Sequence, residues 1–415
     1  MPKRLLTISN GHGEDNHTSH VIRTLRQLCP DLDIAAQAVV GEGLAYRTLD
    51  VPIVGPTQVL PSGGFTYVNR LLLIDDFRAG LLGLTWRQLQ AVRRHAKTCD
   101  LVFATGDVVG QCFAYLSGKP FVSFISPLSS MYEGHLNMDL ILWRVLRSPR
   151  CLTVFTRDPH TAKNLASQGL DKVQFGGIPS LDRLVPRGKD IALSPDVPQI
   201  ALLPGSRLPE AERNFQMQLR LIEFIGQIVP RPEMQFRAAL VPGLMERVAE
   251  VAAGAEWASE PVGDRAVRLT PPALNSDLNP DRNIEVLCYS DAFSDIVCSC
   301  TLVIGMAGLA VDQAVAIGKP VIQLAGEGPQ FTYAFAEAQQ RLLGLSSQTF
   351  GLNGAATDAD LQVAARRTVE TIQDADYLAR CFQHGRDRFG PPGASTRIAS
   401  AVLEALGIEI GDRAA

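Results

Sequence analysis

The chain has 415 residues, which is more than one hydrophobic core usually serves, so two domains are expected. A hydrophobic content of 46%, a charged content of 20% and a net charge of −4 exclude a strongly basic protein built to bind nucleic acid. The apolar run at the N-terminus is too short for a signal peptide, and no stretch of about 18 apolar residues predicts a membrane span. The eight cysteines are scattered without a Cys-x-x-Cys pair, which indicates reduced core thiols of a cytoplasmic protein.

The first half of the chain alternates short apolar runs with segments of helical period. Strands are expected at 4–9, 33–40, 100–104, 120–124 and 151–156, and helices at 15–28, 85–98, 108–117 and from Asp158-Pro159 onward. The stretch 186–198 is rich in Pro and has little periodicity, which predicts an inter-domain linker.

A second alternation follows this linker. Strands are expected near 199–203, 235–240, 284–288, 301–304 and 320–324, with helices between them. The stretch 254–283 is rich in Pro, Asn and Asp and predicts a surface insertion. Two successive alternations indicate an α/β chain with two doubly wound parallel sheets, and ligands of such sheets bind at the carboxyl ends of the strands. We therefore expect two Rossmann-like domains facing a central cleft, as in the GT-B fold of glycosyltransferases and sugar-nucleotide 2-epimerases.

Two glycine turns in the second half are typical of phosphate-binding loops. The first is Leu-Leu-Pro-Gly-Ser-Arg at 202–207, where the backbone N–H groups of Gly205 and Ser206 and the guanidinium of Arg207 would hold a nucleotide diphosphate. The alternative is an ordinary turn between a strand and a helix, with an arginine at the surface.

The second glycine turn opens a helix of small residues over 305–313. Its backbone would approach a phosphate, and an acidic or amide side chain would bind ribose hydroxyls. Gly-Glu-Gly-Pro-Gln at 326–330 supports this interpretation, whereas close packing of the helix on the sheet is the alternative. The predicted contacts are Met306, Ala307, Gly308, Leu309, Ala310, Asp312, Gln313, Gly328, Pro329 and Gln330.

The loop Ser-Asn-Gly-His-Gly-Glu-Asp at 9–15 follows the first strand. It lacks the Rossmann G-x-G-x-x-G and carries two acids, which favours a sugar or acceptor over a phosphate. Asn10, Gly11, Gly13 and Asp15 are the predicted acceptor contacts, and His12 and Glu14 are reserve candidates for a general base. The alternative is that Glu14 and Asp15 are favourable charges in the first turn of a helix. The spacing of the nearby histidines fits no metal motif, so no metal is expected.

Thr-Gly-Asp at 105–107 follows another apolar strand. Asp107 would take the proton of an acceptor hydroxyl, with Gly106 in the substrate site. The alternative is that Asp107 is the N-cap of the helix beginning at Val108.

The segment 61–97 holds six Lys or Arg residues and two Asp residues, together with Phe, Tyr and Trp. Basic amphipathic segments with aromatic residues lie on anionic bilayers, which predicts peripheral contact with the cytoplasmic membrane face. Two core-facing helices with solvated arginines are the alternative.

Several of these motifs resemble a known family. Leu-Leu-Pro-Gly-Ser-Arg and Gly-Gly-Ile-Pro-Ser-Leu-Asp at 176–182 resemble lipid-A-disaccharide synthase. The opening Ser-Asn-Gly-His-Gly-Glu-Asp and the stretch 318–332 resemble the related proteins of cyanobacteria. The resemblance covers nearly the whole chain and implies an inverting, metal-independent transfer from a UDP-sugar to a lipid-type acceptor hydroxyl.

The resemblance also implies roles for particular residues. Arg207 would contact the diphosphate, Asp107 would be an essential acid, and Asp312-Gln313 would contact the ribose. The stretch that begins at Phe389 would form a last helix returning to the first domain. True synthases begin with Gly-Glu-Ala-Ser-Gly-Asp, and many relatives have a glutamate where Gln313 stands, so the donor sugar and the acceptor stay open.

We expect an acceptor-binding domain over 1–190, a nucleotide-sugar-binding domain over 191–388, and a returning helix over 389–415. The expected partners are a UDP-sugar and a lipid or glycolipid acceptor, without nucleic acid, metal or cofactor. The sequence leaves the oligomeric state open, a homodimer included. The alternative functions are a UDP-N-acetylglucosamine 2-epimerase-like enzyme and a catalytically silent sugar-nucleotide-binding protein.

Overall fold

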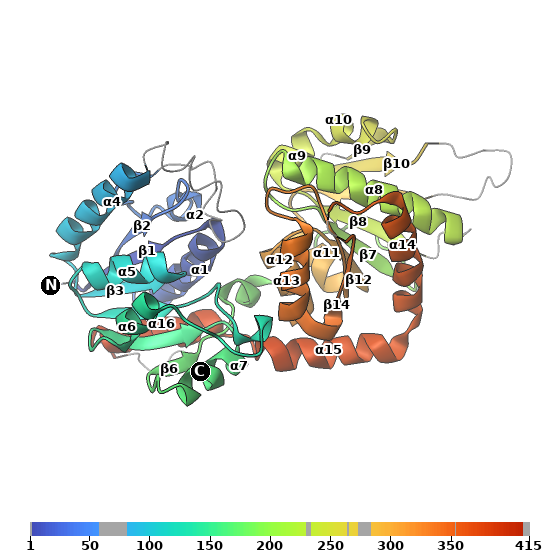
Figure 1. Cartoon of the computed structure of the whole chain (residues 1–415). Helices are drawn as coiled ribbons and strands as arrows, with labels where there is room; N and C mark the ends of the chain where they lie inside the picture. The colour runs from blue at the N-terminus through green and yellow to red at the C-terminus, as the bar shows by residue number, and fades with distance from the viewer. Residues whose placement is uncertain are drawn as a thin grey trace. The chain divides into compact units, whose positions relative to one another are not determined.

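The computed structural model describes residues 2–57, 81–229, 234–263, 265–272, 284–352 and 354–409. The chain forms two compact units, Met1–Arg183 with Phe389–Ala415, and Leu184–Arg388 (Figure 1). The expected boundary at 190 lies inside the second unit, and so does the stretch 186–198 that we expected to be a linker.

The first unit is built on a six-stranded sheet in the order β2-β1-β3-β4-β5-β6, with all strands parallel. The strand order reverses beside β1, so the loops after β1 and β3 meet at a topological switch point. The strands are β1 (Arg4–Ser9), β2 (Asp33–Ala38), β3 (Leu101–Thr105), β4 (Phe121–Phe124), β5 (Cys151–Thr156) and β6 (Val173–Phe175). The five expected strands are therefore confirmed, and β6 is an addition of three residues.

Helices cover the first sheet (Figure 1). They are α1 (His12–Leu28), α2 (Leu44–Arg47), α4 (Leu81–Ala96), α5 (Val108–Leu116), α6 (Leu140–Arg147), α7 (Pro159–Ser167) and α16 (Ala394–Ala405), with short 3₁₀ turns η1 (Ser130–Tyr132) and η2 (Pro179–Arg183). Helix α1 begins at His12, three residues earlier than expected.

The C-terminal helix α16 packs against α1 within the first unit, where Ile22, Leu25, Ile398 and Val402 share one hydrophobic core. Its first turn is held by Asp182, the last residue of the Gly-Gly-Ile-Pro-Ser-Leu-Asp motif. The Asp182 carboxylate accepts the backbone N–H groups of Gly393 at 2.6 Å, Ala394 at 3.1 Å and Ser395 at 2.6 Å. This motif therefore caps the last helix, which is a structural use that the sequence did not predict.

The second unit is built on an eight-stranded sheet in the order β14-β13-β12-β7-β8-β11-β10-β9. Its strands are β7 (Gln199–Leu203), β8 (Gln235–Ala239), β9 (Ala258–Val262), β10 (Ala266–Thr270), β11 (Val286–Tyr289), β12 (Leu302–Gly305), β13 (Val321–Leu324) and β14 (Ser347–Phe350). The all-parallel prediction is wrong at one edge, because β10 pairs antiparallel with both β9 and β11.

The predicted surface insertion over 254–283 is also wrong for its described residues, since β9 and β10 extend the sheet there. Leu269 is buried on one face of β10. On the same strand, Arg268 pairs with Glu260 of β9 and with Glu285 just before β11, so charged side chains on the other face join β10 to its neighbours.

The helices of the second unit are α8 (Glu210–Ile228), α9 (Pro242–Glu246), α10 (Val248–Ala253), α11 (Phe293–Ser299), α12 (Leu309–Ala316), α13 (Tyr333–Leu343), α14 (Asp358–Gln373) and α15 (Ala375–Phe389), with the 3₁₀ turn η3 (Gly344–Ser346). Phe215, Leu219 and Ile222 of α8 are fully buried in the main core cluster of this unit. Buried apolar side chains therefore anchor helix α8 to the core of this unit.

The structure bears on the expectations about membrane spans and cysteines. None of the helices in the described residues is long and apolar enough to cross a membrane. All eight cysteines are free thiols, five of them buried and three half-buried.

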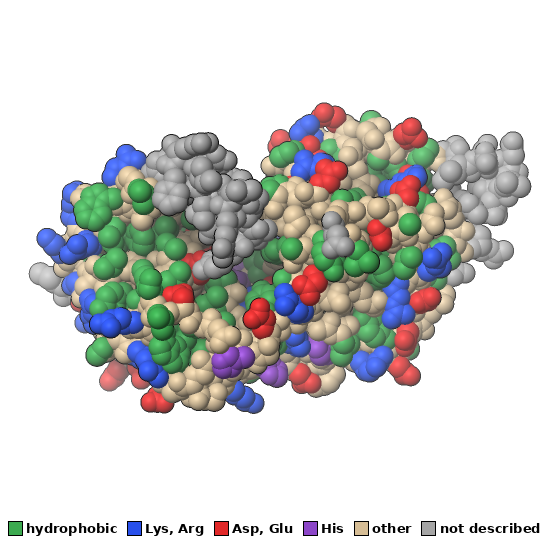
Figure 2. Space-filling model, viewed as in Figure 1, with side chains coloured by type: hydrophobic (Ala, Val, Ile, Leu, Met, Phe, Trp, Pro, Cys, Tyr) green, Lys and Arg blue, Asp and Glu red, His purple; other side chains and the backbone are tan. Residues whose placement is uncertain are grey.

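On the face seen in Figure 2, apolar side chains gather over the first unit with Lys and Arg side chains around them. Most of the predicted membrane segment, residues 61–80, lies outside the described residues, and α4 forms nearly all of the rest.

Candidate active site

Three loops of the second unit share one edge of its sheet. Strands β13, β12 and β7 are neighbours and parallel, so the segments that follow their carboxyl ends lie side by side. These segments carry the predicted phosphate and ribose contacts. The backbone N–H of Met306 donates to the carbonyl of Leu203 at 2.8 Å, which joins the loop after β12 to the end of β7. The structure therefore brings the predicted donor-site residues together.

Gly205 makes this approach of two loops possible. It has a φ of +109°, and an added Cβ would lie 3.0 Å from the carbonyl oxygen of Met306. A side chain at this position would strain the backbone and push the loops apart. Ser206 beside it is exposed and Arg207 is half-buried, so both reach the surface of this edge.

The third loop curls back on itself, because the N–H of Gly326 donates to the carbonyl of Phe331 at 3.1 Å. The side-chain amide of Gln330 reaches toward Gly308, where an added Cβ would lie 3.9 Å from its Nε2. Gly308 is the N-cap residue of α12. Since the first N–H groups of a helix have no partner within the helix, Gln330 lies beside a natural anion-binding position.

Asp312 and Gln313 lie in the first turns of α12 and are 6% and 8% exposed. The Asp312 carboxylate accepts the Nε2 of Gln339 at 3.0 Å, and the same amide donates to the carbonyl of Gly308 at 2.9 Å. This contact holds the start of α12 against α13. The ribose contact of Asp312 and Gln313 stays a prediction.

Sequence reasoning missed three buried polar residues behind these loops. Glu210, Asn214 and Gln218 lie on one face of α8 and are 4%, 3% and 0% exposed. The available signal was polar side chains at positions i, i+4 and i+8 of a helix that is otherwise apolar on its inner face. Such a stripe cannot remain buried unless each side chain finds a hydrogen-bond partner.

The switch point of the first unit joins two of its predicted loops. Asn10 Nδ2 donates to Asp107 Oδ1 at 2.7 Å, and the N–H of Asp107 donates back to Asn10 Oδ1 at 3.2 Å. Gly106 has a φ of +131°, and an added Cβ would lie 1.6 Å from Asn10 Oδ1. Only glycine therefore leaves room for the Asn10 amide.

Asp107 is the N-cap of α5, as the alternative interpretation stated, since its Oδ1 accepts the N–H of Val109 at 2.9 Å. Among the described residues, all hydrogen bonds to this carboxylate reach Oδ1, which leaves Oδ2 to receive a proton. Burial raises the pKa of Asp107, and the hydrogen bonds from Val109 and Asn10 oppose this rise. Its role as a base stays a prediction.

Glu14 lies in the same corner as Asn10 and Asp107. An added Cβ on Gly11 would lie 2.3 Å from Glu14 Oε2, and one on Gly106 would lie 3.5 Å from its Cγ. The His12 ring instead packs against Gly41, where an added Cβ would lie 2.9 Å from His12 Cε1. Glu14 and Asp15 both lie in the first turn of α1, as the helix-dipole interpretation requires, but burial opposes the charged form of Asp15.

Asp15 lies beneath the loop and is only 2% exposed. Ser9 Oγ donates to its Oδ1 at 2.5 Å and also contacts the Tyr46 hydroxyl. Its Oδ2 is buried without a hydrogen-bond partner in the described residues. Burial raises the pKa of Asp15 to about 7, and the nearby Glu14 charge adds to this rise. The acceptor contact of Asp15 stays a prediction.

Two histidines of α1 are also enclosed. Burial lowers the pKa of His17 to about 3 and that of His20 to about 4, and neighbouring arginines contribute in both cases. Both are therefore neutral at physiological pH. Within the described ranges, no three His, Cys, Asp or Glu side chains are grouped to hold a metal ion.

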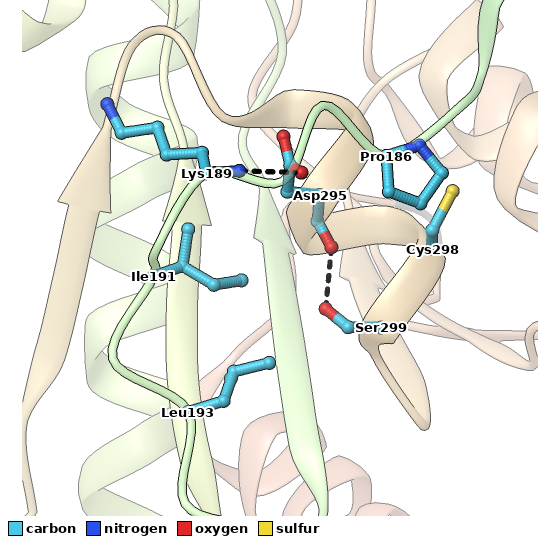
Figure 3. A pocket seen from close by; sticks show the side chains of 7 residues that line it. All are labelled: Pro186, Lys189, Ile191, Leu193, Asp295, Cys298 and Ser299. Carbon is cyan, nitrogen blue, oxygen red and sulfur yellow. Dashed lines mark hydrogen bonds between the residues drawn. The ribbon is translucent and has the colours of Figure 1, made fainter.

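A cavity of about 260 Å³ lies beside α11 in the second unit (Figure 3). Asp295 lies on its wall and accepts the N–H groups of Arg187 at 2.7 Å, Gly188 at 2.8 Å and Lys189 at 3.2 Å. Ser299, also on this wall, donates to the side chain of Gln199 at 2.7 Å. Gln199 is the first residue of β7, so the cavity lies at the amino end of the strand and not at the edge that carries the three loops.

Comparisons with known proteins agree with this architecture. The chain is 24% identical over 411 residues to the lipid-A-disaccharide synthase of Myxococcus xanthus, and the match covers 98% of each protein. The resemblance that the motifs indicated is thereby confirmed. No family model matches the chain.

Solved structures with the same fold include both enzyme classes expected from the topology. CalG4, the calicheamicin glycosyltransferase, superposes with a TM-score of 0.61 at 14% identity and 98% coverage of both chains. The UDP-GlcNAc 2-epimerase of Neisseria meningitidis, bound to UDP-GlcNAc, gives 0.56 at 13% identity, with 97% and 100% coverage. The chain therefore has the GT-B fold.

Proposed function

We propose that this protein is a glycosyltransferase that moves a sugar from a UDP-sugar to the hydroxyl of a lipid-type acceptor. The observation that carries the proposal is the shared edge of β7, β12 and β13, where glycine loops, a helix N-terminus and Arg207 lie together. The similarity to a lipid-A-disaccharide synthase over nearly the whole chain supports the same class of reaction.

The donor would bind at this edge of the second unit. The diphosphate carries the negative charge that a helix N-terminus and an arginine stabilise best. Backbone N–H groups of Gly205 and Ser206, the start of α12 and the Arg207 guanidinium are the proposed contacts. The Gln330 amide, beside Gly308, would bind the phosphates or the donor sugar.

The transfer would be a single displacement with inversion. The acceptor oxygen attacks the anomeric carbon while the bond from that carbon to the diphosphate oxygen breaks, and the electron pair leaves with UDP. The acceptor proton passes to Asp107 Oδ2, with Glu14 or His12 as reserve bases. A raised pKa strengthens Asp107 as a proton acceptor, and Asn10 fixes its orientation through Oδ1. Positive groups would stabilise the departing charge, so the proposal needs no metal.

A lipid acceptor would place the first unit near a membrane surface. Helix α4 exposes Leu82 by 69% and Trp86 by 59%, and carries the exposed arginines Arg87, Arg93 and Arg94. Apolar side chains among cations suit an anionic bilayer. We expect the protein to sediment with anionic vesicles and the Leu82→Ser/Trp86→Ser double variant to remain in solution. Equal sedimentation of both proteins would remove the membrane contact through α4.

The test of the proposed reaction is whether release of UDP depends on an acceptor. The purified protein is incubated with UDP-N-acetylglucosamine, with and without an extracted lipid fraction, and both UDP and the sugar product are measured. We expect UDP only when lipid is present, together with a glycolipid product.

The epimerase alternative is favoured by one observation, the shared fold with a UDP-GlcNAc 2-epimerase. It predicts conversion of UDP-N-acetylglucosamine without lipid. Binding of UDP with no turnover under either condition would favour the catalytically silent alternative.

A further inference from the structure

The buried polar stripe of α8, formed by Glu210, Asn214 and Gln218, contacts the end of β12 and the loops after β7 and β13, which belong to the candidate donor site. Asn214 Nδ2 donates to the carbonyl of Pro204, just after β7, at 2.9 Å. Gln218 Nε2 donates to the carbonyl of Ile304, near the end of β12, at 3.2 Å. Each side chain thus contacts a different segment, and Glu210 reaches the loop after β13.

Glu210 has the most specific contact of the three. Its Oε1 accepts the backbone N–H of Gln330 at 3.0 Å and that of Phe331 at 2.5 Å. These residues lie in the loop after β13, 120 and 121 positions further along the chain. A carboxylate that accepts two successive N–H groups fixes both the position and the orientation of that short segment.

The neighbouring Arg213 strengthens the attachment of the same loop. Its Nη2 donates to the carbonyl of Gly328 at 2.6 Å, and its Nε lies 3.2 Å from Glu327 Oε2. Positions 210, 213 and 214 face the same side of a helix because they are spaced by three and four residues. Glu210 and Arg213 therefore hold the loop after β13, and Asn214 holds the loop after β7.

From these contacts we infer that Glu210 is a positioning residue of the donor site, an inference that rests on the proposed function. Its carboxylate already accepts the backbone N–H groups of Gln330 and Phe331. The donor therefore contacts this loop through side chains and not through these two backbone N–H groups. The side-chain amide of Gln330 is thereby held beside Gly308 at the start of α12. Glu210 does not contact the donor, and its effect passes through Gln330.

The experiment measures UDP affinity by calorimetry for the wild-type protein and for Glu210→Ala, Glu210→Gln and Gln330→Ala. Loss of both hydrogen bonds is expected to weaken UDP binding about tenfold in Glu210→Ala. Glu210→Gln keeps an oxygen that accepts the same two N–H groups, so its affinity is expected within about threefold of wild type. Glu212→Ala is the matched control, because Glu212 lies in the same helical turn but pairs with Arg247.

A double-mutant cycle separates positioning from general stability. Gln330→Ala should weaken UDP binding in the wild-type background. In the Glu210→Ala background it should weaken UDP binding little further, since the side-chain amide of Gln330 is already misplaced there. If both substitutions act additively, or if Glu210→Ala binds UDP as the wild type does, the inference is wrong. Should Glu210→Ala fail to fold, Glu210→Asp replaces it, because it keeps the charge and shortens the reach.

Hydrogen exchange distinguishes failure of this inference from failure of the proposed function. The amides of Gln330 and Phe331 should exchange faster in Glu210→Ala than in wild type or Glu212→Ala, with no ligand present. If the wild-type protein does not bind UDP but these amides are protected by Glu210, the proposed function fails and the structural attachment remains. Unchanged exchange in Glu210→Ala would overturn the inference whatever the protein binds.

Discussion

The two units arrange polar groups differently at the edges where their sheets end. In the first unit, polar side chains of the loops bind one another, as in the Asn10–Asp107 pair and in the contact of Ser9 with Asp15. In the second unit, the loops contain Gly205, Gly308 and Gly326, and the buried side chains that hold them come from the helices α8 and α13. Substitutions in the first unit should therefore change chemistry and protonation, whereas those in the second should change binding.

The largest effect is expected for Asp107→Asn. Asparagine caps a helix about as well as aspartate but cannot take a proton at neutral pH. We expect kcat to fall on the order of a hundredfold or more, with UDP affinity and melting temperature nearly unchanged. Steady-state kinetics and calorimetry on the same preparation measure all three.

The matched control is Asp374→Asn, because Asp374 lies just before α15 and its Oδ1 accepts the N–H of Tyr377 at 2.8 Å. This variant should keep its turnover. Nearly normal kcat in Asp107→Asn would mean that Asp107 serves only as the cap of α5, and the base would then have to be sought at Glu14.

Asp15→Asn should change the pH dependence of stability. The folded pKa of Asp15 is raised to about 7, so between about pH 4 and 7 the folded state keeps a proton that the unfolded state has released. Stability from this group is therefore fully present at low pH and is lost as the pH rises through 7. The variant lacks this loss and should gain on the order of a few kcal/mol over wild type by pH 8.

Urea unfolding of both proteins at pH 5 and pH 8 checks this prediction. His17 and His20 act in the opposite direction, because their lowered pKa values make the folded state lose stability as the pH falls below about 6.5. They are present in both proteins, so the difference between wild type and variant isolates Asp15. A difference that does not grow between pH 5 and pH 8 would contradict the raised pKa.

Arg207→Ala should weaken UDP binding about tenfold or more, since one charge-assisted contact to the diphosphate is lost. The UDP affinity of Arg207→Lys should lie between those of wild type and Arg207→Ala, because lysine keeps the charge and loses the forked geometry. The control is Arg265→Ala, an exposed arginine of the same unit that pairs with Asp291. Equal UDP affinity in wild type and Arg207→Ala would remove Arg207 from the donor site.

The smallest effect is expected for Asp182→Ala, which removes the cap of α16. We expect the free energy of unfolding of the first unit to fall by about 1 kcal/mol. UDP affinity should not change, because Asp182 and α16 both belong to the first unit. Calorimetric unfolding with and without UDP measures both effects, and an unchanged transition would show that the three N–H groups do not need Asp182.

The sequence predicted the strands best where they are continuously apolar. Strands β1, β3, β4 and β7 are buried along nearly their whole length, so their composition alone marks them. Strand β9 was missed because Ala-Ser-Glu-Pro-Val is exposed and resembles a loop, and β6 because three residues carry no period. Helix α1 begins before the expected residue because His12, Gly13 and Glu14 are polar or small and carry no apolar period.

The sequence predicted which loops form the candidate sites, but not which side chains in and around them contact one another. Residues after neighbouring strand ends could be grouped from topology alone, which brought Asn10 near Asp107 and Gly205 near Met306. The partners themselves lie 97 residues apart for Asn10 and Asp107, and 120 apart for Glu210 and Gln330. No local period connects such residues, so the capping of α16 by Asp182 and the polar stripe of α8 required the structure.

The most direct test of the account is a calorimetric titration of the purified protein with UDP, GDP and ADP side by side. The account predicts selective binding of UDP that is weakened in both Arg207→Ala and Glu210→Ala and retained in Asp107→Asn. Binding of none of the three nucleotides would contradict it, because the glycine loops of the second unit would then be structural turns without a donor.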